Sequence, residues 1–311
     1  MPGESNAILV TVAHYLRKFK QGSRLRVVIF PLMLVNDHVL FLLEDDAMIA
    51  ILRQMSYLLS AFLMIFSAGA QAAEQKAREA GRTRAVFSVS WQPGFCRTRP
   101  ERLECKAETQ DGFSAMHFTL HGLWPVGKSY CGIDAAVKAQ DRKGKWLELP
   151  RPELANEAMV TLAAVMPGVQ SGLDRHQWLR SGRCYSASAE AYFEGQMRYL
   201  DALNRSAVRS LFVEKLGGMV TEQEVRQAFD TAFGPGAGER VRLHCAKTGK
   251  ETIVTGLTIG LGDSGAVTPV SASAGTAGQG NAGSALSALI LAADATHGKC
   301  ASGTIARAEA R

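Results

Sequence analysis

Two short stretches of the sequence combine histidine with residues that suit acid–base chemistry. The first, HFTLHGLWPVG, covers residues 117–127 and holds His117 and His121 among alternating apolar residues. The alternation predicts a strand that ends before Gly-Leu-Trp-Pro, with both imidazoles on one face. At about 3.3 Å per residue the two rings stand roughly 13 Å apart. They cannot form one acid–base pair, so His121, at the end of the predicted strand, needs a partner from elsewhere.

The second stretch, HQWLRSGRC, begins at His176 and offers that partner. If it is helical, His176 and Arg180 lie one above the other at i, i+4. Gln177 and Ser181 then form the adjacent row on the same wall. An imidazole beside a guanidinium, with His121 opposite, suits a phosphodiester, because arginine supplies charge and hydrogen-bond donors and the histidines transfer protons.

These two stretches resemble the two active-site motifs of the ribonuclease T2 family, in particular its periplasmic bacterial branch. FTLHGLWP matches the first motif residue for residue, and the similarity continues through SVSWQPGFC and the cysteine positions, over roughly Val86 to Gly262. The resemblance implies attack of the RNA 2′-hydroxyl on the adjacent phosphorus, giving a 2′,3′-cyclic phosphate. It also implies a single-stranded RNA substrate, no metal ion and no cofactor, with catalytic roles for His121, His176, Gln177 and Arg180.

The second stretch departs from the family pattern His-Glu-Trp-x-Lys-His-Gly-x-Cys. Gln177 stands for the glutamate, Arg180 for the lysine and Ser181 for the second histidine. Gln177 forms hydrogen bonds but accepts no proton, and Arg180 keeps the charge in a more rigid fork. The hydroxyl of Ser181 can bind substrate but cannot replace an imidazole. Trp124 stacks on a base by resemblance, and a wedge beneath the turn is an equally good interpretation of this residue.

Three hypotheses follow from this divergence. In the first, which we favour, His176 takes over proton transfer opposite His121 and the chain is an active endoribonuclease. It is favoured because Trp124, Pro125 and Trp178 also remain, a set that drift would erode together. In the second, the chain binds RNA without cutting it. In the third, it is a structural or partner-binding exported protein. Losing one member of an acid–base pair commonly costs about 10²- to 10⁴-fold in rate.

The cysteines predict three disulfides in an oxidising compartment, because all six follow the predicted cleavage site at residue 72. The sequence contains no CxxC pair, which argues against a zinc site. Spacing alone does not choose among the possible connectivities. The family resemblance implies Cys131–Cys184 and Cys245–Cys300, and leaves Cys96–Cys105. The first of these bonds ties the loop after the His121 strand to the end of the His176 helix.

The N-terminal part of the chain has the layout of an export signal. Residues 48–72 hold one arginine, an apolar run and a small-residue ending, which predicts a signal peptide cleaved after Ala72. A retained membrane anchor is the alternative, although the apolar run is short for a bilayer span. Residues 1–47 are interpreted as an upstream extension that is not translated. The expected protein is periplasmic or secreted, with no stable membrane association after cleavage.

The remaining patterns predict one α+β domain over residues 73–263, with a central, largely antiparallel sheet packed by helices, because strands and helices mix without a βαβ repeat. Residues 264–296 are rich in Ala, Gly and Ser and predict a low-complexity loop or linker. Residues 297–311 form a tail tied back through Cys300. The net charge of +6 favours a polyanionic partner, and no periodic feature suggests an oligomer, so a monomer is expected.

Overall fold

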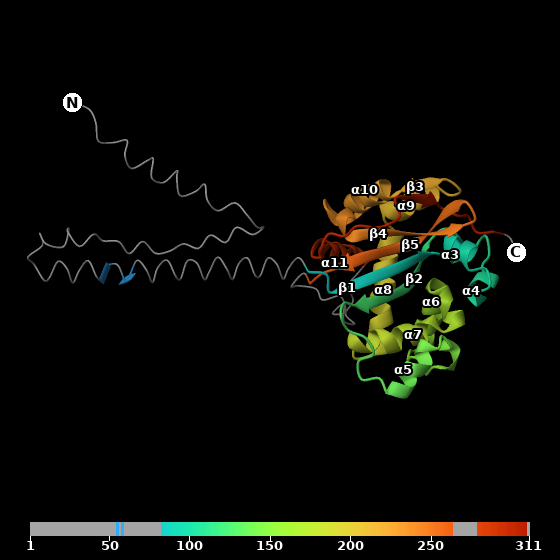
Figure 1. The fold of residues 1–311 in the computed structure, drawn as a ribbon, viewed down its shortest axis with the longest axis horizontal. Helices are drawn as coiled ribbons and strands as arrows, with labels where there is room; N and C mark the ends of the chain where they lie inside the picture. Colours follow the sequence, from blue (N-terminus) through green and yellow to red (C-terminus); the bar gives the residue numbers. More distant parts are fainter. Residues whose placement is uncertain (1–53, 56, 59–81, 264–278, 310–311) are drawn as a thin grey trace, which may run out of the picture. The chain divides into compact units, whose positions relative to one another are not determined.

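The computed structural model describes residues 54, 55, 57, 58, 82–263 and 279–309. The four N-terminal residues of this set are helical, and the rest of the predicted signal peptide and the upstream extension lie outside the described residues. The chain divides into two units, and the second, which begins at Ala68, contains the α+β domain (Figure 1). In the part of the chain that the structure describes, no helix is long and apolar enough to cross a membrane.

A single sheet organises the described part of the domain. Its order is β2-β1-β5-β6-β3, and β4 pairs with β5 on a branch of that path. All strand pairs are antiparallel except β5 with β6, as the sequence predicts for a largely antiparallel sheet. The strands are β1 (Ala85–Trp91), β2 (Phe118–Pro125), β3 (Met219–Thr221), β4 (Val241–Thr248), β5 (Glu251–Leu261) and β6 (Ser302–Thr304).

Helices cover the sheet and extend the domain beyond its β2 edge, where Figure 1 shows α5, α6 and α7. The α-helices are α3 (Gln92–Thr98), α4 (Leu103–Lys106), α5 (Ala135–Arg142), α6 (Asn156–Val165), α7 (Leu173–Arg180), α8 (Ala189–Asn204), α9 (Ala207–Glu214), α10 (Glu222–Phe233) and α11 (Gln279–Leu291). Short 3₁₀ turns join them: η2 (Phe113–Ala115), η3 (Trp146–Glu148), η4 (Pro167–Ser171), η5 (Gly182–Cys184) and η6 (Ala237–Arg240).

The core lies on one face of the sheet, which carries the apolar residues that alternate with serine along β1. Phe87 meets Tyr199 of α8 edge-on at 6.0 Å between ring centroids. Trp91 packs against Phe118 of β2 and Phe212 of α9. Side chains on this face of β1 are almost fully buried, so β1 is fixed by the core and holds β2, and with it His121, in a defined position.

The predicted strand break at Gly-Leu-Trp-Pro is wrong, because β2 runs through this sequence to Pro125. Strand β1 offers a partner along its whole length: Val86 pairs with Trp124, and a register shift lies near the middle of the ladder. Gly122 also lets α7 approach the strand, since a Cβ atom there would lie 2.5 Å from the side-chain oxygen of Gln177. His121 therefore lies inside the strand, one residue before the glycine that α7 approaches.

The predicted loop at 264–296 is wrong for its second half. Residues 264–278 lie outside the described residues, whereas Gln279–Leu291 form α11. Leu286, Leu289 and Ile290 have the i, i+3, i+4 spacing of one helix face, and all three are buried in the core. Alanine and leucine favour helix, so the low-complexity composition concealed a helix that packs against the domain.

The three disulfides of the structure are those that the family resemblance implies: Cys96–Cys105, Cys131–Cys184 and Cys245–Cys300. The second joins the loop after β2 to the end of η5, immediately beyond α7. It therefore limits how far β2 and α7 can separate, which matters because the two elements carry the predicted site.

Candidate active site

The predicted catalytic and substrate-binding residues line one cavity of about 480 Å³ between β2 and α7. They are His121 and Trp124 from β2, and His176, Gln177, Arg180 and Ser181 from α7 and its C-terminal end. The helical spacing that the sequence suggested is present, because α7 begins at Leu173 and ends at Arg180. The fold thus brings together two motifs that are more than fifty residues apart in the chain.

The imidazole of His121 is held from two sides. Its Nδ1 lies 3.4 Å from Oγ of Ser90 on β1, and its ring meets Trp124 edge-on at 5.9 Å between centroids. Burial of the ring and then the nearby charges of His176 and His244 lower the pKa of His121 to about 4. His121 is therefore neutral over most of the pH range, as a proton acceptor must be.

His176 has a carboxylate partner within α5. Its Nδ1 lies 2.7 Å from Oδ1 of Asp141, and the side chain of Asp141 is fully buried. Donation from Nδ1–H to the carboxylate leaves Nε2 as the ring nitrogen that can exchange a proton with a substrate. Trp146 stacks on the same imidazole at 4.2 Å and 18°. The ring of His176 is thus fixed both in its plane and in its tautomer.

The pKa of His176 results from opposing effects. Burial lowers it and the charge of Arg180 lowers it further, while the hydrogen bond and charge of Asp141 raise it. The net shift is downward, so the imidazolium of His176 forms on the acid side of its ordinary range. Without Asp141 the shift would be larger, because only Asp141 among these groups favours the charged ring.

Asp141 is itself oriented by Tyr130. The phenol O–H of Tyr130 donates to Oδ2 of Asp141 at 2.6 Å, and its backbone N–H donates to the carbonyl oxygen of Arg180 at 2.8 Å. Tyr130 has a φ of +55°, which a side chain rarely adopts, and it is followed by Cys131 of the disulfide to Cys184. Burial and the contact with Asp141 raise the pKa of Tyr130, so it stays a donor.

Sequence reasoning missed three members of this site: Tyr130, Asp141 and Trp146. All lie in the segment between the two motifs, where no periodicity distinguishes them from surface residues. The only pointer in the sequence was the position of Cys131, because a disulfide to the end of the His176 helix draws the intervening segment towards the cleft.

Gln177 fixes the tryptophan of the first motif. The indole N–H of Trp124 donates to Oε1 of Gln177 at 2.8 Å, and Gln177 is only 2% exposed. This contact uses the amide oxygen as an acceptor, a role that a carboxylate would also fill. Ser181 follows the last residue of α7 and is 3% exposed, and Arg180 is exposed at the cavity.

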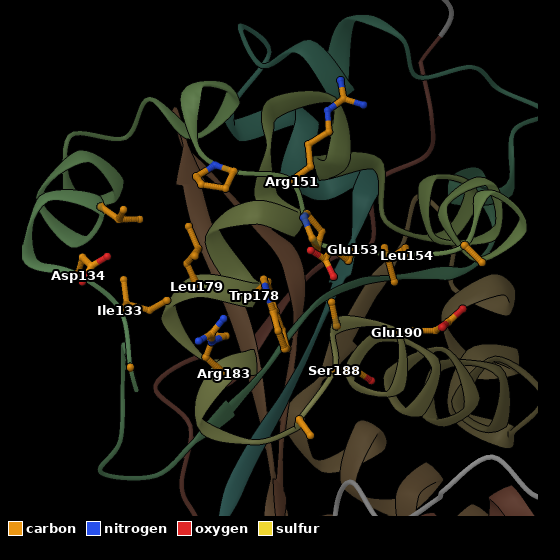
Figure 2. A pocket seen from close by; sticks show the side chains of 17 residues that line it. Ile133, Asp134, Arg151, Glu153, Leu154, Trp178, Leu179, Arg183, Ser188 and Glu190 are labelled. Atoms are coloured by element: carbon orange, nitrogen blue, oxygen red, sulfur yellow. The ribbon is translucent and has the colours of Figure 1, made fainter.

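A larger cavity of about 900 Å³ lies against other residues of α7 and does not contain the histidines. Figure 2 shows Trp178, Leu179 and Arg183 at its wall, with Asp134 and Arg151 around it. Its lining mixes both signs of charge and offers no imidazole. His121 and His176 thus line the smaller cavity and not this one. Among the described residues, no group of three or more His, Cys, Asp or Glu is arranged to hold a metal ion.

The chain is similar to a protein family, to a curated relative and to solved structures. The model of the ribonuclease T2 family matches residues 83–266. Ribonuclease I of Escherichia coli (strain K12) is 29% identical over 211 residues, which is 60% of this chain and 79% of the relative. Among solved structures, a ribonuclease MC1 mutant in complex with 5′-UMP is 18% identical with a TM-score of 0.42, over 72% of this chain and 98% of that chain. RNase NT in complex with 5′-AMP is 19% identical with a TM-score of 0.37, over 57% and 84%.

Proposed function

Because the chain belongs to the ribonuclease T2 family, we propose that it is an exported endoribonuclease that cleaves single-stranded RNA without a metal ion. Family membership supports ribonuclease activity in general. One observation carries the specific proposal, namely the hydrogen bond between Asp141 and His176 in the cavity that also holds His121. It provides a second, oriented imidazole in a site where the family's second histidine has become Ser181.

The two histidines divide the proton transfers of the first step. Neutral His121 accepts the proton of the 2′-hydroxyl as its oxygen attacks the adjacent phosphorus. The imidazolium of His176 donates its Nε2 proton to the departing 5′-oxygen, and Asp141 stabilises the charged ring before transfer. Arg180 offers positive charge to the phosphorane oxygens. The products are a 2′,3′-cyclic phosphate and a 5′-hydroxyl, and water can open the ring with the two roles reversed.

Trp124 is the proposed base platform. Its indole is held by Gln177 and lies edge-on to His121, so one ring face can stack on a nucleobase beside the scissile phosphate. Stacking tolerates every base, and we therefore propose weak base preference at this position. Ser181 is proposed to bind substrate through its hydroxyl.

A second candidate is a relative that binds RNA without cutting it. Ser181 and the lowered pKa of both His121 and His176 favour this alternative, because little imidazolium is present at neutral pH. Both candidates predict binding of single-stranded RNA, but only the first predicts its cleavage.

Digestion of single-stranded RNA in EDTA by the purified domain tests the proposal. Cleavage with 2′,3′-cyclic phosphate ends is expected, most readily at acid pH. Binding of RNA with no cleavage from acid to neutral pH would select the second candidate.

Ser181→His introduces the histidine of the family motif. If His176 already transfers the proton, the rate of RNA cleavage at the optimum pH should change by less than about tenfold in either direction. A gain of about 10²-fold or more would mean that the natural site lacks a working acid or base. Steady-state cleavage of one oligonucleotide by both proteins gives the comparison, and Ser181→Ala controls for loss of the hydroxyl.

Export and a monomeric state are part of the proposal. Three disulfides pair every cysteine of the chain, which fits an oxidising compartment. N-terminal sequencing of the exported protein should find Ala73 first, and a mature chain that retains residues 48–72 would instead support the membrane anchor. Gel filtration tests the monomer.

A further inference from the structure

The sheet connects the cleft to a second groove at β4. His121 contacts Ser90 of β1, Ser90 pairs with Gly256 of β5, and Gly256 pairs with His244 of β4. Directly paired residues of antiparallel strands point to the same side of the sheet. His244 therefore shares a face with His121, about 14 Å away at a strand spacing of about 4.8 Å.

No large side chain occupies this row between the two histidines. Ser90 is small, and Gly256 has no side chain because a Cβ atom there would lie 2.2 Å from the carbonyl oxygen of Val89. Thr258, the next residue of β5 on this face, lies 2.8 Å through its Oγ1 from Nε2 of His244. The row between the two histidines thus consists of small residues, of which Ser90 and Gly256 are themselves buried.

A groove of about 690 Å³ lies between β4 and the segment 297–302. Among the described residues that line it there is no aspartate or glutamate, whereas it contains Arg242, His244, Lys247, His297 and Lys299. Within the described part of the chain, neither lysine takes part in an ion pair. A concave surface whose only charged side chains are basic suits a polyanion.

The walls of this groove are fixed relative to each other. The disulfide Cys245–Cys300 joins β4 to the 297–302 segment, and both cysteines line the groove. Arg242 donates a hydrogen bond through Nε to Thr296, just before that segment. Glu222, which does not line the groove, accepts from the backbone N–H of Gly298 and is paired with Arg226 at 3.3 Å. The lysine charges are therefore available and the site needs little reorganisation to bind.

We propose that this groove, the β4 groove, binds backbone phosphates of the same RNA chain whose scissile phosphate lies at His121. The proposal rests on RNA being the substrate, as proposed above, and adds a distal contact a few nucleotides from the cleaved bond. Lys247 and Lys299 supply the charge from opposite walls. A dinucleotide is too short to reach them, whereas a longer strand occupies both sites.

The test uses the double variant Lys247→Gln/Lys299→Gln in the full domain. The matched control is Lys106→Gln/Lys143→Gln. Lys106 is the last residue of α4 and Lys143 is the first residue after α5; both are exposed, and neither lines the β4 groove. The probe is a 2′-O-methyl oligonucleotide of about a dozen nucleotides, within the site sizes usual for single strands. It cannot be cleaved, because its 2′-oxygens carry no proton.

The groove variant should bind this oligonucleotide about three- to tenfold more weakly than the unmodified protein and the control. The slope of log affinity against log salt should become shallower by about 1.4, since each lost phosphate contact changes it by about 0.7. Cleavage of a dinucleotide should be the same in all three proteins.

Equal binding by the groove and control variants, equal losses in both, or failure of the unmodified protein to bind the oligonucleotide would each overturn the proposal. If the unmodified protein binds the oligonucleotide but cleaves no RNA, the proposed catalysis fails, and the comparison of the two variants still decides the role of the groove.

Discussion

Replacing His121 by alanine is expected to lower kcat/KM for RNA cleavage by about 10³-fold, within the usual range for loss of a general base. His121 is the histidine of the cavity whose pKa of about 4 keeps it neutral, and the remaining imidazole, His176, is committed to the opposite role. Binding of an uncleavable oligonucleotide should change little, because Arg180 and Trp124 stay in place.

His117→Ala provides the matched control for this experiment. It removes an imidazole from the same motif, but His117 precedes β2, stacks on Phe113 and does not line the cavity. RNA cleavage by His117→Ala should be as fast as cleavage by the unmodified protein. If His121→Ala retained more than a tenth of the activity, or if His117→Ala lost as much, His121 would not be the base.

Asp141→Asn is expected to move only one limb of the pH profile. The charge of Asp141 raises the pKa of His176, so removing it lowers that pKa. His176 must be protonated to act as the acid, and activity therefore falls as pH rises through its pKa. The alkaline limb should shift to lower pH, with a loss of about 10²-fold in kcat/KM near neutrality. The acid limb, set by His121, should stay near pH 4.

The position of the alkaline limb of the pH profile distinguishes a changed pKa of His176 from a loss of folded protein. Less folded enzyme lowers the rate equally at every pH, whereas a changed pKa moves the curve. Asp134→Asn is the matched control, because Asp134 precedes the same helix but is exposed and lines the other cavity. An Asp141→Asn profile that merely scales down, with both limbs in place, would assign Asp141 a structural role alone.

The sequence predicted those parts of the fold that depend on local patterns. The alternation in β1, the β-branched run in β5 and the capping box at Thr221 and Glu224 are local patterns of this kind, because neighbouring residues alone specify the element. The helix α7 follows for the same reason. The residue types of the two motifs then sufficed to place His121 and His176 on facing elements.

The predictions from the sequence were wrong where the structure of a segment depends on residues far away in the chain. Gly-Leu-Trp-Pro forms a strand because β1 pairs with it, and α11 forms a buried helix because the core receives Leu286, Leu289 and Ile290. Asp141 stands among lysines and arginines on α5 and has the sequence context of a surface residue. It is 2% exposed because α5 packs against α7, a contact that no local pattern encodes.

The pH dependence of RNA cleavage by the unmodified protein in EDTA, with analysis of the product ends, tests the two-histidine account most directly. The account predicts a bell-shaped profile with its maximum on the acid side, between the pKa of His121 near 4 and that of His176 below its ordinary 6.5, and 2′,3′-cyclic phosphate ends. No cleavage at any pH, an optimum above neutrality, or products with 3′-hydroxyl ends would contradict it.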